Sequence, residues 1–192
     1  MRRSREDKAK SRERIVAVAA ARIREAGTEA PGVAEIMHEA GMTHGGFYKH
    51  FQSRDELIAA ALEQALVDGD AYVDELTDAA SDPLAAFVDW YVSAEHVANP
   101  AAGCAVAALG GDVGRGSEAL HVLYRAQVER YLGRLEQLLG SRERATVALA
   151  TLVGAITVAR GLGEPLLAEE ILGDVRAALK TAAGPRKTGV RS

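Results

Sequence analysis

Residues 40–57, AGMTHGGFYKHFQSRDEL, combine glycines with two histidines, three aromatic residues and a lysine in one short stretch. The apolar residues that precede it recur at helical spacing, which predicts a short helix over residues 33–40 that ends at Gly41. Glycine at that position permits a left-handed turn, and Thr43 is a suitable N-cap for a following helix. The stretch is therefore typical of a helix-turn-helix corner.

The second helix of this corner separates its side chains into two groups. Phe47 and Phe51, four residues apart, are expected on the buried face, whereas the outward face carries His44, Gly45, Tyr48 and Lys49. Gly45 and Gly46 would each cost a helix about 1 kcal/mol relative to alanine, so we expect a partner that approaches closely. A nucleic-acid backbone fits, because a helix N-terminus offers unpaired N–H groups and a positive dipole to phosphate.

Charge is distributed unevenly along the chain. Residues 1–54 hold 11 Lys and Arg against 7 Asp and Glu, a net charge of +4, whereas the remainder holds 12 against 20, a net charge of -8. A basic N-terminal part followed by an acidic remainder favours a polyanionic partner for the N-terminal part. Charge alone leaves open the alternative of two solvated faces with a chance imbalance.

Composition bounds the class of protein. With 192 residues, 48% apolar and 26% charged, the sequence predicts a soluble globular chain. The single Cys104 excludes an internal disulfide framework, and the charged N-terminus lacks the apolar core of a signal peptide, so a cytoplasmic location is expected. The most apolar run, residues 145–159, is shorter than the roughly 20 residues that cross a bilayer, so no membrane partner is predicted.

The rest of the chain is predicted to be helical, because apolar residues recur at three and four and no alternating β-branched run occurs. The all-α chain is divided into a helix-turn-helix domain over residues 11–70, with its corner at about 33–52, and a second domain over 71–184. Residues 1–10 and 185–192 are expected to be disordered tails. Expected helices cover residues 15–26, 33–40, 43–51, 53–67, 83–97, 104–111, 117–139, 141–160 and 165–181.

Catalytic and metal sites are not predicted. The five histidines, His38, His44, His50, His96 and His121, lack metal-ligand spacing on one helical face. No nucleophile elbow, phosphate-binding loop or strand-flanked dinucleotide fingerprint occurs, so we expect neither an enzyme nor a cofactor. A helical small-molecule-binding enzyme and a non-transcriptional interaction protein remain the alternatives.

The segment GVAEIMHEAGMTHGGFYKHFQSRDELIAAAL resembles the DNA-binding signature of the TetR family of transcriptional regulators. The resemblance covers about residues 12–62. Its pattern is met at Gly41, Met42, Thr43, Gly45, Phe47, Tyr48, His50, Phe51, Ser53, Arg54, Asp55 and Leu57. The resemblance implies an all-α homodimer with an N-terminal three-helix DNA-binding domain and a C-terminal domain for ligand binding and dimerisation.

The resemblance also implies roles at the corner. Thr43 would bind a phosphate, Tyr48 and His50 would meet phosphates or base edges, Lys49 would meet a phosphate or a purine, and Arg54 would clamp a phosphate. The predicted DNA-binding set is Thr43, His44, Gly45, Gly46, Tyr48, Lys49, His50 and Arg54.

Three positions depart from the family pattern. His44 stands where lysine is common, Gly46 where Thr, Ser or Ala is common, and Pro31 with Gly32 where a Ser or Thr often caps the helix. Because each departure removes a charge or a hydroxyl, affinity could rely more on a basic arm. This arm comprises Arg2, Arg3, Arg5, Lys8 and Lys10, and a solvated tail is the alternative.

The penultimate helix is apolar nearly all round over residues 146–159, which predicts a subunit interface; a core helix of a monomer is the alternative. Small residues on it, Ala148, Thr151, Ala155 and Ala159, would allow close approach, and the last helix supplies Ile171, Val175, Ala178 and Leu179. In TetR-family proteins two such helices form a four-helix bundle with their mates, which implies a homodimer through residues 141–160 and 165–181.

Aromatic residues with polar atoms mark candidates for an effector pocket. These candidates are Phe87, Trp90, Tyr91, His96, Cys104 and Tyr124. Cys104 at a helix start is either a reactive thiol or an inert buried one. The function expected is that of a repressor that binds a pseudo-palindromic operator as a dimer and is released by a small-molecule effector.

Overall fold

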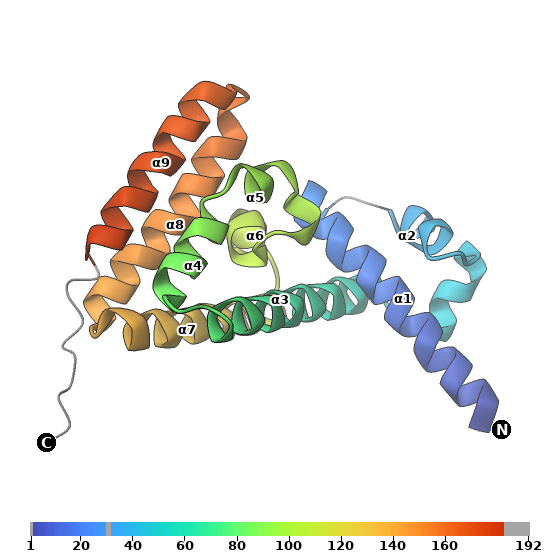
Figure 1. The fold of residues 1–192 in the computed structure, drawn as a ribbon. Helices are drawn as coiled ribbons and strands as arrows, with labels where there is room; N and C mark the ends of the chain where they lie inside the picture. Colours follow the sequence, from blue (N-terminus) through green and yellow to red (C-terminus); the bar gives the residue numbers. More distant parts are fainter. Residues whose placement is uncertain (1, 30–31, 183–192) are drawn as a thin grey trace, which may run out of the picture. The chain divides into compact units, whose positions relative to one another are not determined.

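The computed structural model describes residues 2–29 and 32–182, and this part of the chain is helical without a strand (Figure 1). The all-α prediction is confirmed. In chain order the elements are α1 (Arg2–Ala26), α2 (Val33–Glu39), η1 (His44–Lys49), α3 (Arg54–Asp78), α4 (Pro83–Tyr91), α5 (Ala94–Ala98), η2 (Pro100–Ala102), α6 (Ala105–Val113), α7 (Glu118–Leu139), α8 (Arg142–Leu162) and α9 (Pro165–Ala182).

Helix α1 begins at Arg2, so the prediction of a disordered tail over residues 1–10 is wrong for the part that the structure describes. The segment lacks Gly and Pro, is rich in good helix formers, and places Glu6 four residues before Lys10. The basic arm is thus a helical extension, and Lys8 and Lys10 on it are exposed. The predicted tail over residues 185–192 lies outside the described residues.

Helix α2 begins and ends as its sequence predicts. At its start the Glu35 carboxylate accepts a hydrogen bond from the Gly32 N–H at 3.1 Å. At its end Gly41 has a φ of +74°, and the N–H groups of Gly41 and Met42 donate to the carbonyls of His38 and Met37. These paired bonds form a Schellman turn, which reverses the chain tightly after the helix.

The second helix of the corner differs from its prediction. Residues 44–49 form a 3-10 helix, η1, and the Thr43 hydroxyl does not cap it, although Thr43 is the N-cap residue and its carbonyl accepts from the Gly46 N–H at 2.9 Å. Two adjacent glycines weaken α-helix propensity, and short pieces of chain readily adopt the tighter winding. The burial of Phe47 and Phe51, each 2% exposed, is confirmed.

Helix α3 is longer than expected, since it runs to Asp78 and not to residue 67. Gly69 lies inside it without ending it. The start agrees with the prediction: the Ser53 hydroxyl accepts from the Glu56 N–H at 3.1 Å, and the Glu56 carboxylate accepts from the Gln52 N–H at 2.7 Å. The first bond satisfies one of the N–H groups that a helix start leaves unpaired, and the second ties the residue before the cap to the first turn.

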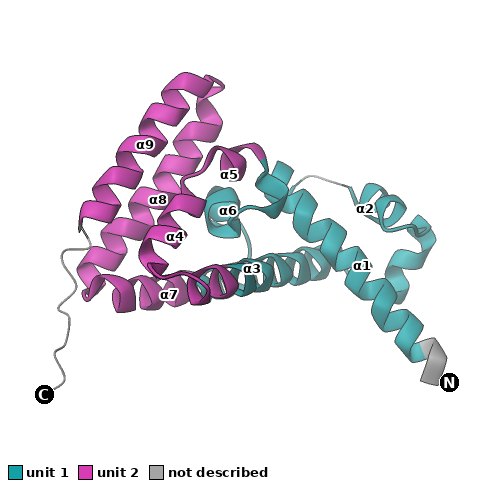
Figure 2. Ribbon diagram, viewed as in Figure 1, with its two compact units in different colours: residues 1–72, 99–127 teal, residues 73–98, 128–192 magenta. Residues whose placement is uncertain are grey.

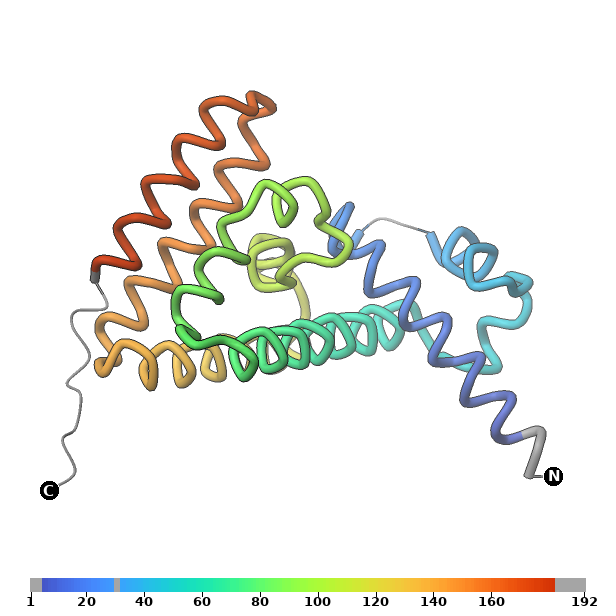
Figure 3. Tube along the Cα trace, viewed as in Figure 1, coloured from blue at the N-terminus to red at the C-terminus, as the bar shows by residue number. Residues whose placement is uncertain are grey.

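By its contacts the chain divides into two compact units (Figure 2). Unit 1 contains residues 1–72 and 99–127, and unit 2 contains 73–98 and 128–192. Helices α3 and α7 each pass from one unit to the other without a break, as the continuous trace in Figure 3 shows. The segment 99–127 therefore belongs with the N-terminal residues, whereas the functional division at residue 70 stays a prediction.

Each unit has its own apolar core. In unit 1, α1 packs against α2, η2 and α6, and the side chains buried there include Ile15, Ile23, Met37, Leu57, Leu62 and Leu109. In unit 2, α8 and α9 lie side by side and α4 and α5 pack on them, with Tyr91, Leu135, Leu152 and Ile156 fully buried.

The two faces of α8 are unlike one another. The face turned into unit 2 is made of seven buried residues: Ala145, Ala148, Leu149, Leu152, Ala155, Ile156 and Ala159. The prediction that Ala148, Ala155 and Ala159 allow close approach to a partner subunit is therefore wrong, because these residues pack inside their own chain. The outward face carries Val147 at 60% exposure and Val158 at 49%.

By length and composition α8, with 21 residues, is long enough to cross a membrane, which corrects the estimate made from residues 145–159. The same test is passed by core helices of soluble proteins. Within unit 2 this helix packs against α4, α5 and α9, as a core helix does.

Candidate nucleic-acid interface

The Schellman turn after α2 and the helix η1 present most of the predicted DNA-binding residues on one continuous segment of unit 1. Thr43, His44, Gly45 and Lys49 are exposed, and Tyr48 is 75% exposed, whereas Gly46 and His50 are half-buried. A large aromatic ring this exposed contributes little to folding. The segment therefore offers polar and aromatic groups to a partner.

Buried rings hold this segment in place. Phe47 stacks on Phe51 with ring centroids 5.6 Å apart, and Tyr48 meets Phe47 edge-on at 5.2 Å. On α1 the guanidinium of Arg12 lies 4.9 Å from the centroid of the Phe51 ring, a cation–π contact. Since both phenylalanines are buried, the exposed side of η1 is fixed relative to α1.

His50 lies in a positively charged environment. Burial, together with the nearby charges of Lys8, Lys49 and Arg12, lowers the pKa of its imidazole. Its Nδ1 atom is buried without a hydrogen-bond partner among the described residues. The cations gathered around His50 favour an anionic partner such as a phosphate near this position.

Lys8 and Arg12 near His50 were only partly expected, since Lys8 was predicted as part of the arm and Arg12 was not predicted at all. The two residues are four apart on α1, so they share one helical face. The four-residue spacing of Lys8 and Arg12 could have indicated that they lie together. It does so only if the chain is already helical before residue 11, which was not predicted from the sequence.

The two glycines of η1 are not required by the protein's own packing. A Cβ atom added to Gly45 would meet nothing within 4 Å, and one added to Gly46 would lie 3.6 Å from Met37 Cε and 3.8 Å from Thr43 Oγ1. Both distances are at ordinary van der Waals contact. The open space at Gly45 therefore agrees with the expectation that the glycine admits an external partner.

Arg54, the remaining predicted contact, has an internal partner. Its Nη2 donates to the Thr28 carbonyl at 2.5 Å, and the residue is half-buried at the start of α3. The guanidinium is thus partly engaged by the turn between α1 and α2. Its phosphate contact stays a prediction.

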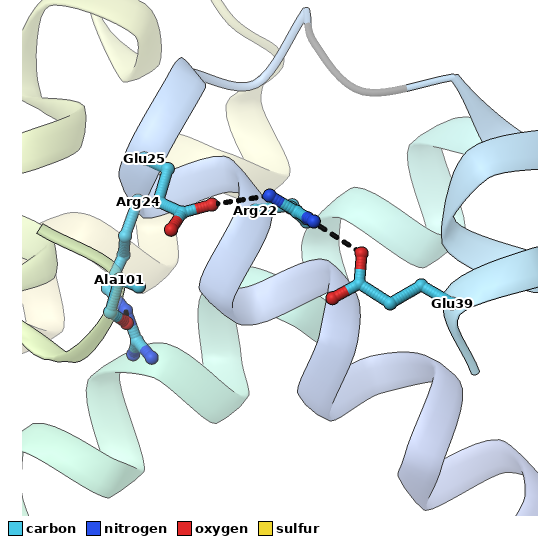
Figure 4. Close-up of polar contacts among 5 residues, drawn as sticks. All are labelled: Arg22, Arg24, Glu25, Glu39 and Ala101. Carbon is cyan, nitrogen blue, oxygen red and sulfur yellow. Dashed lines mark hydrogen bonds and ion pairs between the residues drawn. The ribbon is translucent and has the colours of Figure 1, made fainter.

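Two further arginines of α1, Arg22 and Arg24, connect this helix to neighbouring elements of unit 1 (Figure 4). Arg22 donates to Glu39 of α2 at 2.7 Å and to Glu25 at 2.9 Å, and these hydrogen bonds raise its pKa. Arg24 donates to the carbonyls of Ala101 and Ala65, and its burial lowers its pKa. Exposed ion pairs such as those of Arg22 each stabilise a protein only slightly. The partly buried hydrogen bonds of Arg24 therefore contribute more to holding α1 in place.

The six predicted effector residues fall into two groups. Phe87, Trp90, Tyr91 and His96 form an aromatic cluster in unit 2, whereas Cys104 and Tyr124 belong to unit 1. Within the cluster, Trp90 stacks on His96 with ring centroids 5.2 Å apart and planes at 8°. In unit 1, Cys104 is buried at the start of α6 and the Tyr124 hydroxyl donates to the Val106 carbonyl at 3.1 Å.

Unit 2 also contains a cavity of about 290 Å³ that sequence reasoning did not find. Of the predicted effector residues only Phe87 lines it, beside the buried Tyr131 and an Arg134–Asp74 ion pair at 2.7 Å. These contributors come from α3, α4 and α7, and no local pattern connects them.

His96 makes the stability of unit 2 depend on pH. Its Nδ1–H donates to the Tyr91 carbonyl at 2.7 Å, and burial, with a smaller contribution from Arg160, lowers its pKa to about 4. The unfolded chain, with a histidine pKa near 6.5, takes up this proton first as the pH falls. Stability is therefore complete above about pH 6.5 and is lost as the pH falls toward 4.

We expect the free energy of unfolding to decrease by about 2 kcal/mol between pH 7 and pH 5 from this residue alone. Urea titrations at the two pH values measure it. His96→Gln, which retains an N–H donor, should remove that part of the decrease, and the exposed His38→Gln should not. An equal pH dependence in His96→Gln and the unsubstituted protein would contradict the assignment.

The comparisons with known proteins agree with this geometry. Residues 15–61 match the family model "Bacterial regulatory proteins, tetR family". The Transposon Tn10 TetC protein of Escherichia coli is 39% identical over 54 residues, which is 28% of this chain and 27% of that protein. This chain therefore matches only about a quarter of that relative's length.

Solved structures extend the likeness to the whole fold. A TetR transcriptional regulator from Chloroflexus aurantiacus superimposes with a TM-score of 0.79 at 22% identity, covering 91% of this chain and 96% of that one. The reduced form of NemR from E. coli gives 0.77 at 20% identity, covering 90% and 96%. Residues 15–61 thus match the TetR family model, and over nine-tenths of its length the chain has the fold of solved TetR-family regulators.

Proposed function

We propose that the protein is a repressor that binds a pseudo-palindromic DNA operator as a homodimer and releases it when a small molecule binds the C-terminal part of the chain. The observation that carries the proposal is the exposed row Thr43, Tyr48 and Lys49 on a helix fixed by buried phenylalanines. Regulators of this family are transcription factors and not enzymes. A cytoplasmic location follows for a DNA-binding protein of this kind.

The two ends of η1 would contact different parts of the DNA. Thr43 and the backbone at Gly45 would lie against the phosphates, while Tyr48 and Lys49 would reach a base edge or a second phosphate. The cations Lys8 and Arg12, which lie near His50 and Lys49, support a further phosphate contact because together they make this part of the surface positively charged.

The homodimer would form through the outward faces of α8 and α9. Val147 and Val158 on α8, with Leu166 at 76% exposure and Leu167 at 41% on α9, are large apolar side chains that a single chain leaves exposed to water. Such a surface favours burial against a second copy of itself. A dimer also supplies the two recognition segments that a pseudo-palindromic operator requires.

For the effector, the unit 2 cavity beside Phe87 and Tyr131 and the aromatic cluster around His96 are the two candidate sites. Both offer aromatic surface with polar groups, which suits a small molecule with an apolar body. Coupling is reciprocal, so an effector found by thermal-shift screening should bind more weakly when operator is saturating.

Selection of bound duplexes from a random pool, followed by fluorescence anisotropy, tests DNA recognition. Specific binding whose affinity falls steeply with salt supports the proposal. A folded dimer that enriches no sequence would contradict it and would favour the non-transcriptional alternatives.

Gly45→Ala tests the close approach of DNA to η1. The added methyl group enters empty space, so the free protein should be as stable as before or more stable by up to about 1 kcal/mol. Operator affinity should fall about tenfold if a phosphate lies against this backbone. Gly133→Ala in α7, also facing open space, is the control and should leave affinity unchanged. If Gly45→Ala keeps full operator affinity, the inference that Gly45 allows a phosphate to approach the backbone is wrong.

A further inference from the structure

The turn that ends α1 is held by residues from two other parts of unit 1. The Thr28 N–H donates to the Oδ2 of Asp112, in α6, at 2.9 Å. The Thr28 carbonyl accepts from Nη2 of Arg54, in α3, at 2.5 Å. Thr28 is 6% exposed, and both of its backbone polar groups are paired with these two side chains.

The fit around Asp112 is close. Gly27 ends α1 with a φ of +87°, and a Cβ atom at that position would lie 2.5 Å from the Asp112 Oδ2. The other carboxylate oxygen, Oδ1, accepts from Nη2 of the exposed Arg115 at 2.8 Å. The carboxylate thus binds the exposed Arg115 through Oδ1 and, with Oδ2, occupies the space that the missing side chain of Gly27 leaves free.

Packing alone does not fix the turn. Thr28, Arg54 and Asp112 line a cavity of about 210 Å³, together with Asp55 and Ile58. Because the space beside the turn is not filled by side chains, the position of the turn depends on its polar contacts. The two hydrogen bonds to Thr28 therefore have more influence on position than they would have in a filled core.

We propose that Asp112 and Arg54 are positioning residues that clamp Thr28 between them, and that Arg54 acts through this clamp and not as a ligand of a DNA phosphate. The proposal rests on the proposed DNA-binding function. The clamp fixes the position of the turn that follows α1, and so the position of α2 and η1 relative to the start of α3. Asp112 thereby becomes a determinant of operator binding although it lies outside the helix-turn-helix region.

The dependence of operator affinity on salt separates the two roles of Arg54. A residue that neutralises a phosphate lowers the slope of log affinity against log salt by about one when it is removed. Lys49→Ala is expected to show that change. Arg54→Ala should weaken binding about tenfold with the slope of the unsubstituted protein, because it loosens the turn without removing a phosphate contact.

Asp112→Ala should give a similar loss of about tenfold with an unchanged slope. Since either substitution opens the same clamp, the double variant should lose little more than each single one, whereas independent effects would multiply to about a hundredfold. Arg115→Ala leaves the Asp112–Thr28 bond in place and should stay within about twofold. If Asp112→Ala does not fold, Asp112→Asn provides the comparison, since its amide oxygen still accepts from Thr28 and most of the affinity should remain.

Three results would overturn the proposal: a salt slope lowered by about one in Arg54→Ala, unchanged affinity in a folded Asp112→Ala protein, or losses that multiply in the double variant. If the unsubstituted protein binds no duplex, the proposed function fails first. Hydrogen exchange at the Thr28 amide then decides the clamp by itself. Protection at least tenfold lower in Arg54→Ala supports it, and equal protection overturns it.

Discussion

Replacing Tyr48 and Lys49 together by alanine is expected to weaken operator binding by about a hundredfold while the protein stays folded. Tyr48 is 75% exposed and Lys49 is also exposed, so neither supports the core. Each is expected to contribute one contact to a phosphate or a base edge, worth about 1–3 kcal/mol, and the two losses combine. Anisotropy titrations at several salt concentrations measure the change.

The control for this experiment is a second pair of exposed residues away from η1. Tyr72→Ala with Arg125→Ala also removes a partly exposed tyrosine and an exposed cation, at 48% and 69% exposure, and should retain operator affinity. If the variant at Tyr48 and Lys49 is folded by circular dichroism and binds as tightly as the control, η1 does not carry recognition.

Val158→Glu is expected to convert the proposed dimer to a monomer and, with it, to abolish tight operator binding. Val158 is 49% exposed in the single chain, so a glutamate is tolerated there unless a second subunit covers it. Burying that carboxylate without a partner costs several kcal/mol, enough to shift dimer dissociation by a hundredfold or more. Light scattering and analytical ultracentrifugation report the mass directly.

Val122→Glu makes the same change at a similarly exposed position, 52%, on α7 and should leave the dimer intact. The choice of Val158 follows from the structure, because Ala155 on the same helix is buried inside its own chain and would report on folding. A stable dimer of Val158→Glu protein would show that the interface lies elsewhere.

The helix-turn-helix corner could be predicted because its signals are local. Gly41 alone permits the left-handed turn, and the four-residue spacing of Phe47 and Phe51 identifies the buried face. The winding of η1 was not predictable in the same way, since Thr43 has the chemistry of an α-helix cap but does not use its hydroxyl here. Helix α3 passes through Gly69 because a single glycine costs only about 1 kcal/mol in a long helix.

The remaining differences come from contacts that join distant parts of the sequence. Asp112 and Thr28 are separated by 84 positions, and nothing local to either residue indicates the other. The same holds for Arg24 and Ala101, which are 77 positions apart. The effector candidates were chosen by residue type, so no signal could tell that Cys104 and Tyr124 belong to unit 1 while the other four belong to unit 2.

The discontinuous make-up of unit 1 constrains how parts of this protein can be exchanged with those of similar proteins. A hybrid made by joining residues 1–72 to a foreign body would leave behind residues 99–127, and with them the carbonyl that Arg24 binds and the carboxylate that holds Thr28. Such a hybrid would contain η1 but would lack the contacts from residues 99–127 that hold α1 and the turn after it in place. Exchange of DNA specificity should therefore be attempted by transplanting the exposed side chains of η1 onto an intact chain, or by moving residues 99–127 along with the N-terminal part.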